Sequence, residues 1–313
     1  MSTVIRMTTS SEPSVETCGC VVVTGASTGI GAASARELAR QGFQVLAGVR
    51  REQDADALRA LRIEPVILDI TQPDHVADLA ARVRSEPMAL RALVNNAAIS
   101  INAPVEALPL DEWRRLFEVN LFGHIAVTQA LLPALLRSSG RVINISSVGG
   151  RVAMATFGPY GGTKFALEAV SDALRRELAP LGVRVVVVEP GGVRTEMGDR
   201  GIAATSRLAA AMSPEHQDRY GSLVQAVNAL TAAGTGRGKS ADDVARVIAK
   251  AVTARKPRTR YTVGRDAALL TRLSRVLPDS MLDRVSAAAL RPHYPKATTA
   301  RNQSVPPLSS TSV

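Results

Sequence analysis

Short apolar segments alternate with stretches of helical periodicity along the first two thirds of the chain. The apolar segments predict strands at residues 20–24, 45–49, 65–70, 92–95, 141–146 and 183–189. The spacing of apolar residues between them predicts helices near residues 32–41, 52–62, 74–85, 110–136, with a break at Pro133, and 158–180. Strands that are apolar at nearly every position are typical of a parallel sheet with helices on both faces. The pattern therefore predicts an α/β fold, a doubly wound parallel sheet in one domain.

The periodicity weakens after Pro190, where polar and helical fragments replace the regular alternation. A helix start is expected at Ser240, with Asp243 three residues later as the partner of a capping box. A last strand is expected at residues 261–263. These elements close a domain that we place at residues 18–265.

Beyond this domain, leucine, valine and methionine at helical spacing predict two short amphipathic helices on either side of Pro278. They form a helical extension over residues 266–290. The two ends of the chain, residues 1–17 and 291–313, are rich in Ser, Thr or Pro and show no periodicity. Both ends are expected to be disordered.

The chain has 313 residues, with 38 Lys and Arg against 28 Asp and Glu, so its formal net charge is +10. Residues 255–313 alone hold 11 basic and 3 acidic side chains, a balance of +8, so the main body is nearly neutral. This basic end has only two aromatic residues, Tyr261 and Tyr294, and no motif that reads a nucleic-acid groove. We therefore expect no nucleic-acid partner.

Cysteines and apolar runs indicate the compartment. The only cysteines, Cys18 and Cys20, are too close in sequence to bridge each other, which favours a reducing compartment.

No run of about 18 apolar residues occurs, so no membrane-spanning helix is expected. The first residues include acids and lack an apolar core, so no secretory signal is expected. The four histidines are scattered, and we predict a cytoplasmic protein without a metal site.

A glycine-rich loop follows the first predicted strand and precedes the first predicted helix. Glycines let the backbone approach a pyrophosphate closely, and the helix N-terminus offers free N–H groups. A tight turn without a ligand is the alternative, and the strand–loop–helix context favours dinucleotide binding. The loop residues in question are Thr24, Gly25, Ser27, Thr28, Gly29, Ile30 and Gly31.

Tyr160 and Lys164 stand four residues apart, so they share one face of a helix. A phenol with its ordinary pKa of about 10 is a poor acid or base at neutral pH, and a nearby ammonium lowers that pKa. Ser147 lies 13 residues before Tyr160, at the end of a predicted strand. When a carbonyl accepts hydride, its oxygen gains negative charge, which a serine hydroxyl can stabilise and a phenol can protonate.

Together these motifs resemble those of the short-chain dehydrogenase/reductase family, over about residues 20–265. They follow the family's order: the loop from Thr24 to Gly31, Asn95-Asn96-Ala97-Ala98, Asn120, Ser147, Tyr160-x3-Lys164, and Pro190-Gly191 with Thr195. The family's spacing selects Ser147 rather than Ser146 as the catalytic serine. Ala98 departs from the family, which usually has glycine there. The resemblance implies that the doubly wound sheet is a Rossmann fold.

The resemblance also implies the roles of individual residues. Ser147 would hydrogen-bond the substrate oxygen, Tyr160 would exchange its proton, and Lys164 would hold the nicotinamide ribose. Asn120 would anchor a water in a proton relay, and Thr195 would orient the nicotinamide carboxamide. The implied cofactor contacts are Thr24, Gly25, Ser27, Thr28, Gly29, Ile30, Gly31, Arg50, Arg51, Asp69, Ile70, Asn96, Ala97, Tyr160, Lys164, Pro190, Gly191, Val193 and Thr195.

The end of the second strand bears on the choice of cofactor. NAD enzymes usually place an acid there to bind the ribose hydroxyls, whereas the family pattern puts Val49 at this position, followed by Arg50 and Arg51. A guanidinium can pair with a 2′-phosphate, so NADP(H) is predicted, with NAD(H) as the alternative. The two arginines could also simply begin a solvated helix. Asp69 matches the family residue that contacts the adenine amino group.

The implied function is an oxidoreductase that interconverts a secondary alcohol and a ketone or aldehyde by hydride transfer. A regulatory protein that binds NAD(P) without turnover is the alternative, but such proteins commonly lose the tyrosine or lysine that this chain keeps. Parts of the chain are similar to the retinol, hydroxysteroid and hydroxybutyrate dehydrogenase branch. That similarity and the apolar residues of segment 192–240, the expected substrate lid, imply a lipophilic substrate.

Two further expectations concern partners. Family members are usually dimers or tetramers, so the resemblance implies a homodimer or homotetramer paired through the helix that carries Tyr160. The extension at residues 266–290 is expected to close the pocket or pack on the domain. Peripheral contact of its apolar stripes with an anionic membrane surface is the alternative.

Overall fold

The computed structural model describes residues 18–295, so the predicted disordered segment 1–17 and residues 296–313 lie outside the described residues. Seven parallel strands form one sheet in the order β3-β2-β1-β4-β5-β6-β9. The order reverses between β1 and β4, which confirms the doubly wound sheet and places its crevice at the carboxyl ends of these strands. The strands are β1 (Cys20–Val23), β2 (Gln44–Val49), β3 (Ile63–Ile67), β4 (Leu90–Asn95), β5 (Arg141–Ile145), β6 (Arg184–Pro190) and β9 (Arg260–Val263).

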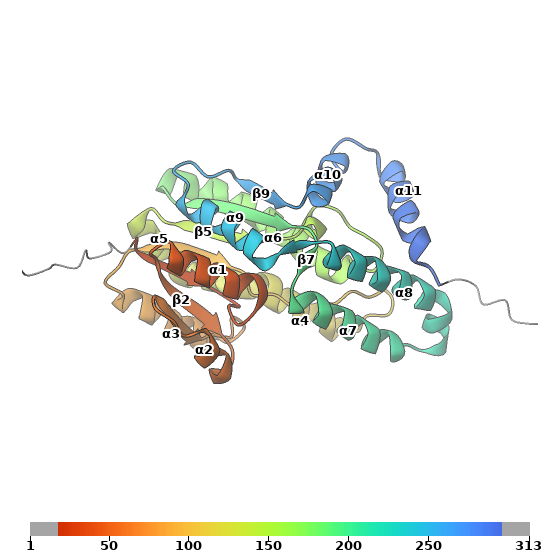
Figure 1. The fold of residues 1–313 in the computed structure, drawn as a ribbon, viewed down its shortest axis with the longest axis horizontal. Helices are drawn as coiled ribbons and strands as arrows, with labels where there is room; N and C mark the ends of the chain where they lie inside the picture. Colours follow the sequence, from red (N-terminus) through yellow and green to blue (C-terminus); the bar gives the residue numbers. More distant parts are fainter. Residues whose placement is uncertain (1–17, 296–313) are drawn as a thin grey trace, which may run out of the picture.

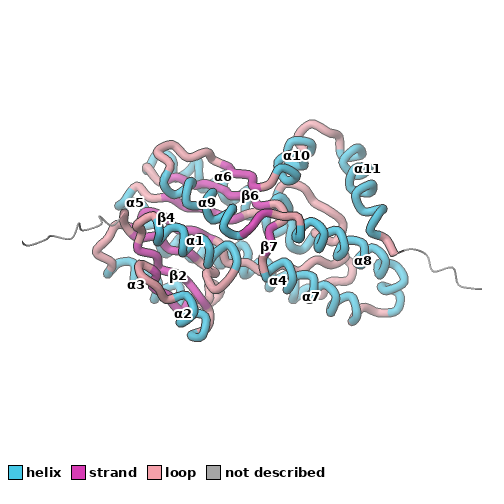
Figure 2. The backbone as a smooth tube through the Cα atoms, viewed as in Figure 1, coloured by secondary structure: helices cyan, strands magenta, loops and turns pink. Residues whose placement is uncertain are grey.

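Helices cover both faces of the sheet (Figures 1 and 2). One face packs against α1 (Gly29–Arg40), α2 (Glu52–Leu58) and α9 (Ala241–Thr253). The other face packs against α3 (Pro73–Ser85), α5 (Gly123–Ser138) and α6 (Gly158–Leu178). Successive strand residues enter opposite cores, as Val21 and Val22 do, and this is why the strands are apolar at nearly every position.

The second helix and the third strand differ from the prediction. α2 ends at Leu58 and not near residue 62, because Arg59 leaves helical geometry with a ψ of 122°. Arg62, with a left-handed φ of 65°, then turns the chain into β3. β3 starts at Ile63, before the predicted strand, and contains Pro65. An edge strand tolerates a proline because one of its sides has no ladder partner.

The long helical stretch before β5 is interrupted at a different place from the predicted one. α4 (Leu110–Phe117) continues through a π-helical turn (Glu118–Phe122) into α5, and Pro133 lies inside α5 without ending it. Contrary to expectation, Leu110–Ser138 is long and apolar enough to cross a membrane by composition, with a mean hydropathy of 1.5 over 18 residues. It lies against the sheet as a core helix through Val127, Leu131 and Leu135.

Two long helices replace the fragments predicted for segment 192–240. α7 (Glu196–Ala210) and α8 (Pro214–Gly236) lie side by side and project from the body of the domain (Figure 1). At their base, the short strands β7 (Val193–Arg194) and β8 (Lys239–Ser240) pair in parallel. This arrangement gives the domain a helical arm beside the carboxyl ends of the strands.

The helical extension contains α10 (Arg265–Leu273) and α11 (Asp279–Leu290), on either side of Pro278. The predicted disorder from residue 291 is wrong at its start, where Arg291–His293 forms a 3₁₀ turn against α8. Leu290 explains this order, because its side chain is buried with apolar residues of α8.

Candidate active site

The glycine loop between β1 and α1 is shaped by close backbone approaches. Gly25 and Gly29 have positive φ angles of 64° and 56°. A methyl group on Gly31 would lie 2.2 Å from the Gly25 carbonyl oxygen, and one on Gly29 would lie 3.3 Å from the Thr195 side chain. The loop therefore leaves the N-terminus of α1 open toward the loop after β6, in a cradle that fits a pyrophosphate.

A second loop, after β4, is fastened to the glycine loop. The Thr24 hydroxyl accepts hydrogen bonds from the backbone N–H groups of Asn96 and Ala97, each at 3.0 Å. The Asn96 amide donates to the carbonyl oxygens of Thr24 and Gly25, at 3.0 and 2.9 Å. Thr24 thus holds the two loops together without lining the cavity, whereas Asn96 and Ala97 line it.

The two arginines after β2 point to different surroundings. Arg50 lines the cavity, next to Val49. Arg51 precedes α2 and donates two hydrogen bonds to Asp54, at 2.8 and 2.9 Å. Arg51 therefore has the geometry of a helix-start ion pair, and of these two arginines Arg50 is the one that lines the cavity.

Asp69 and Ile70 follow β3 and line the same part of the cavity as Arg50. One Asp69 carboxylate oxygen accepts hydrogen bonds from the backbone N–H and the hydroxyl of Thr71, at 3.0 and 2.7 Å. This local turn fixes the orientation of the Asp69 carboxylate at the cavity wall.

Ser147, Tyr160 and Lys164 meet in the wall of one cavity. Ser147 lies two residues after β5, and its oxygen accepts a hydrogen bond from the Gly149 N–H at 3.1 Å, which leaves its proton to donate. Lys164, almost fully buried, donates from Nζ to the Ile145 carbonyl oxygen at 2.9 Å. The same Nζ lies 5.8 Å from the centre of the Tyr160 ring.

The pKa of Tyr160 differs from the expectation. Burial raises the pKa of this phenol to about 12, and the group that opposes the shift is Ser147 through a hydrogen bond, not Lys164. Burial also lowers the pKa of Lys164 to about 8, against a nearby carboxylate, Glu168, that raises it. The phenol is thus protonated at neutral pH and suited to give a proton to a carbonyl oxygen.

Asn120 lies in the π-helical turn and is fully buried outside the cavity wall. Its amide oxygen accepts from the Ile99 N–H at 2.9 Å, and its amide nitrogen donates to the Ile99 carbonyl at 2.9 Å and the Thr163 hydroxyl at 3.1 Å. Thr163 in turn donates to the Tyr160 carbonyl at 2.7 Å. Asn120 therefore holds the loop after β4 against the helix that carries Tyr160 and Lys164.

The cavity has a volume of about 1500 Å³ and continues from the glycine loop to the helical arm. Pockets that hold one drug-sized ligand have volumes of roughly 300–1,000 Å³, so this cavity has room for a dinucleotide and a substrate. Pro190, Gly191, Val193 and Thr195 line it as predicted contacts, whereas Thr24, Gly31, Arg51 and Asn120 lie outside its wall.

Apolar wall residues that the sequence did not single out come from the arm and the extension. They are Met197, Ile202, Leu223, Val227 and Leu230 from α7 and α8, and Ala289 and Leu290 from α11. The spacing of Leu223, Val227 and Leu230 follows a helical face and could have identified them. Leu270 and Val285, which belong to the predicted stripes, also line the cavity.

Within residues 18–295, no group of three or more His, Cys, Asp or Glu side chains is arranged to hold a metal ion. The polar groups that converge on the cavity are instead suited to hydrogen bonding and proton transfer.

Comparisons with known proteins agree with this geometry. A family model described as short chain dehydrogenase matches residues 19–206. Mouse retinol dehydrogenase 5 is 38% identical over 282 residues, which cover 85% of this chain and 86% of the relative. A short-chain dehydrogenase structure from Streptomyces avermitilis is 30% identical, with a TM-score of 0.69, covering 88% of this chain and 96% of that one. One from Burkholderia cenocepacia, in complex with NADP, is 25% identical with a TM-score of 0.68, covering 86% and 98%.

Proposed function

Because the chain belongs to the short-chain dehydrogenase/reductase family, we propose that it interconverts a lipophilic secondary alcohol and the matching carbonyl compound with NADP(H). One observation carries this proposal. Ser147, Tyr160 and Lys164 lie in the wall of a cavity whose far end is the glycine loop. A cofactor on that loop and a substrate under the helical arm would therefore meet at these three side chains.

The chain's own groups provide the proton chemistry. When bound, the nicotinamide supplies or accepts the hydride. Ser147 donates a hydrogen bond to the substrate oxygen and stabilises the charge that develops there. Tyr160 donates its phenolic proton to that oxygen, and in the reverse direction it receives the proton from the alcohol. Lys164, held by the Ile145 carbonyl, supplies positive charge beside the phenol and binds the ribose.

Tyr160→Phe tests this mechanism because it removes only the phenolic oxygen. We expect kcat for ketone reduction to fall at least 100-fold, in line with the usual contribution of a general acid. Binding of NADPH, followed by fluorescence, should remain close to that of the wild type, and circular dichroism should show an unchanged fold. A Tyr160→Phe variant that keeps full activity would exclude Tyr160 as the proton donor.

The substrate class rests on the apolar wall contributed by α7, α8 and α11. Residues such as Met197, Leu223 and Leu290 would bury a large apolar group, while Ser147 and Tyr160 offer hydrogen bonds at one point. The retinol dehydrogenase relative is consistent with an extended apolar alcohol. A panel of ketones and aldehydes graded in size tests the class: kcat/KM should rise with apolar length, and a preference for small polar carbonyl compounds would contradict it.

We also propose a cytoplasmic homodimer or homotetramer paired through α6. Phe165 on α6 and Phe122 in the π-helical turn that contacts α6 are large apolar side chains that are exposed in a single chain. Sedimentation velocity should give a dimer or tetramer for the wild type and smaller species for Phe165→Glu. A monomeric wild type would refute the pairing.

A further inference from the structure

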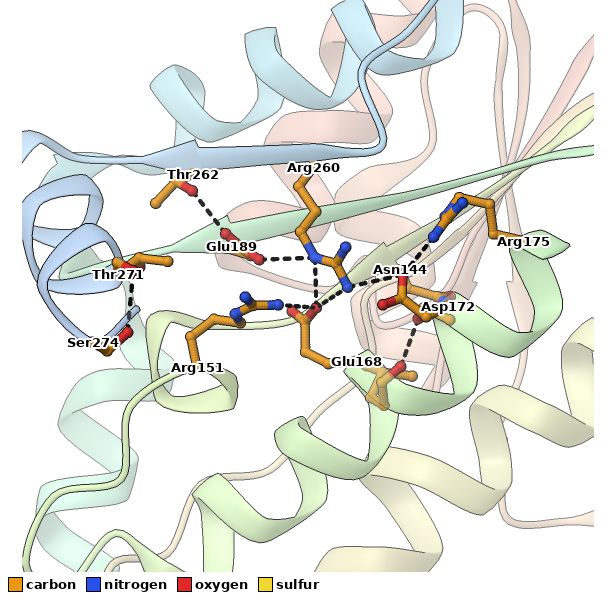
Figure 3. Close-up of polar contacts among 12 residues, drawn as sticks. Asn144, Arg151, Glu168, Asp172, Arg175, Glu189, Arg260, Thr262, Thr271 and Ser274 are labelled. Carbon is orange, nitrogen blue, oxygen red and sulfur yellow. Dashed lines mark hydrogen bonds and ion pairs between the residues drawn. The ribbon is translucent and has the colours of Figure 1, made fainter. Parts of the chain in front are cut away.

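One helical turn after Lys164, α6 carries a second buried charge that the proposed mechanism does not use. Glu168 is almost fully buried, and its Oε2 accepts a hydrogen bond from Nε of Arg260 at 3.0 Å, with Nη2 at 2.9 Å (Figure 3). Arg260 lies on β9, 92 residues along the chain. An arginine of the last strand is therefore paired with a buried carboxylate of the helix that carries Tyr160 and Lys164.

The Arg260 guanidinium is shared among three carboxylates. Besides Glu168, it lies 3.3 Å from Glu189 of β6 and 3.0 Å from Asp172 of α6. Glu189 is almost fully buried, and its other oxygen accepts a hydrogen bond from the Thr262 hydroxyl at 2.7 Å. Two buried carboxylates thus share one arginine, although buried charges are stable only when they are balanced.

The second buried cation in this region is Lys164. Its ammonium has the Ile145 carbonyl as a hydrogen-bond partner, which carries no formal charge. Two partly exposed arginines lie at the edge of the cluster: Arg151, 3.7 Å from Glu168, and Arg175, which pairs with Asp172 at 3.1 Å. Lys164 and Arg260 together match the charges of Glu168 and Glu189.

The other titratable neighbours of Lys164 supply no negative charge. Burial keeps the pKa of His124, on α5, at about 3 and that of Tyr160 at about 12, so both are neutral at pH 7. Glu168 is the group that raises the pKa of Lys164 against the effect of burial. Burial, helped by Glu189, raises the pKa of Glu168 itself, while Ser146 and Arg260 lower it.

We propose that Glu168, anchored by Arg260 one helical turn from Lys164, is a positioning residue that keeps Lys164 charged beside Tyr160. This inference rests on the proposed function, in which Lys164 must carry its charge during proton transfer. The alternative is that the Glu168–Arg260 pair only fastens β9 to α6. The two differ in what happens to Lys164 when the carboxylate loses its charge.

Glu168→Gln removes that charge and keeps the shape of the side chain, and Asp172→Asn is the matched control. Asp172 pairs with the same guanidinium, but it lies two turns from Lys164 and is partly exposed. The chain has only five lysines, so NMR of protein labelled at lysine Cε can follow Lys164 by itself, assigned through Lys164→Arg. We expect the pKa of Lys164 to fall by roughly one unit in Glu168→Gln and to stay unchanged in Asp172→Asn.

The pH profile of ketone reduction should shift in the same way. A one-unit fall from about 8 leaves most Lys164 charged at pH 6 but reduces the charged fraction roughly fivefold at pH 8. We therefore expect kcat of Glu168→Gln close to wild type at pH 6 and roughly fivefold lower at pH 8, with Glu168→Asp recovering part of the loss.

An unshifted Lys164 pKa in a folded Glu168→Gln variant would overturn the proposal and leave a fastening role. If Glu168→Gln does not fold, the triple variant Glu168→Gln/Glu189→Gln/Arg260→Met removes both buried carboxylates together with their arginine, leaves Asp172 paired with Arg175, and permits the same NMR measurement. Because this readout needs no turnover, it is independent of the proposed function, whose failure would instead appear as an inactive wild type.

Discussion

Arg50 and Arg51 are neighbours in sequence that differ in what they can do for a cofactor. Arg50 lines the cavity, whereas Arg51 is tied to Asp54 and its side chain is 62% exposed. A hydrogen bond to a charged group contributes about 1.5–3 kcal/mol. Arg50→Ala should therefore weaken NADPH binding roughly 10- to 100-fold, with little effect on NADH, in a fluorescence titration.

Arg51→Ala is the control for this prediction, because it removes the same charge from the adjacent position. Its Kd for NADPH should stay close to that of the wild type. A larger effect of Arg51→Ala than of Arg50→Ala would mean that the 2′-phosphate, if it is bound, lies outside the cavity wall that Arg50 forms.

His124 makes the stability of the protein depend on pH. Burial, and then Lys164, lower its pKa to about 3, whereas the unfolded chain has a histidine pKa of about 6.5. Between these values the unfolded state binds the proton and the folded state does not. The contribution is therefore complete above pH 6.5 and is lost as the pH falls toward 3, by about 1.4 kcal/mol per pH unit.

Urea unfolding of the wild type and His124→Gln at pH 5 and pH 6 measures this contribution. The free energy of unfolding should decrease more steeply with falling pH in the wild type, since the variant has no imidazole to protonate. Equal slopes for the two proteins would show that His124 takes up its proton without unfolding.

The sequence was sufficient to predict the site residues whose roles depend on their spacing over a few positions. Tyr160 and Lys164 share a helix face, and the glycine loop has a local shape, so both can be predicted without tertiary contacts. Burial is not local, and it reversed the expected direction of the Tyr160 pKa. The Glu168–Arg260 pair joins residues 92 positions apart, and nothing in the local pattern marks either of them.

The start of α9 is an element-scale feature that the sequence predicted in detail. The Ser240 hydroxyl accepts a hydrogen bond from the Asp243 N–H at 3.1 Å, and the Asp243 carboxylate accepts one from the Ser240 N–H at 3.1 Å. α9 packs against α1 and the sheet, so its stability is part of the global stability. Ser240→Ala should lower the free energy of unfolding by about 1 kcal/mol, measured in urea.

Ser213 provides a contrasting cap at the start of α8, where its hydroxyl accepts a hydrogen bond from the His216 N–H at 3.2 Å. Because α8 belongs to the projecting arm, Ser213→Ala should mainly increase hydrogen exchange in α7 and α8. A global loss as large as that of Ser240→Ala would show that the arm and the sheet unfold together.

Elements were mispredicted where tertiary contacts outweigh local preference. The π-helical turn occurs where Asn120 is bound to Ile99 and Thr163, a long-range contact that apolar spacing does not reveal. Pro133 was expected to break the helix, but α5 continues because its apolar face is held against the sheet. In the arm, only helical fragments were predicted, but α8 is continuous over Pro214–Gly236 because its face is buried against α7 and α11.

At the scale of the whole molecule, the pattern of apolar strands was enough to predict the sheet. The pattern of apolar residues in the C-terminal extension did not predict what the extension packs against. An amphipathic stripe shows that a helix covers something apolar, but not what it covers. Here Leu270 of α10 and Leu290 of α11 face the cavity. Leu269 and Val276, from the same predicted stripe as Leu270, remain exposed.

This exposed part of the extension suggests how a lipophilic substrate reaches the cavity. Leu269, Val276, which is 78% exposed, and Met281 lie among the basic residues of the chain's C-terminal end. We propose that α10 and α11 rest on an anionic membrane surface, with the cavity they line close to the lipid. Apolar insertion and attraction of arginines to acidic headgroups would both contribute.

Flotation with vesicles containing phosphatidylserine tests this contact. The wild type should bind at low salt and dissociate as the ionic strength rises, and Leu269→Glu/Val276→Glu should bind several-fold less. Leu61→Glu is the control, because Leu61 is 88% exposed in the turn that follows α2. Figure 1 shows α2 on the opposite side of the molecule from α10. Equal loss in both variants would assign the effect to added negative charge, and the extension would then serve only to close the cavity.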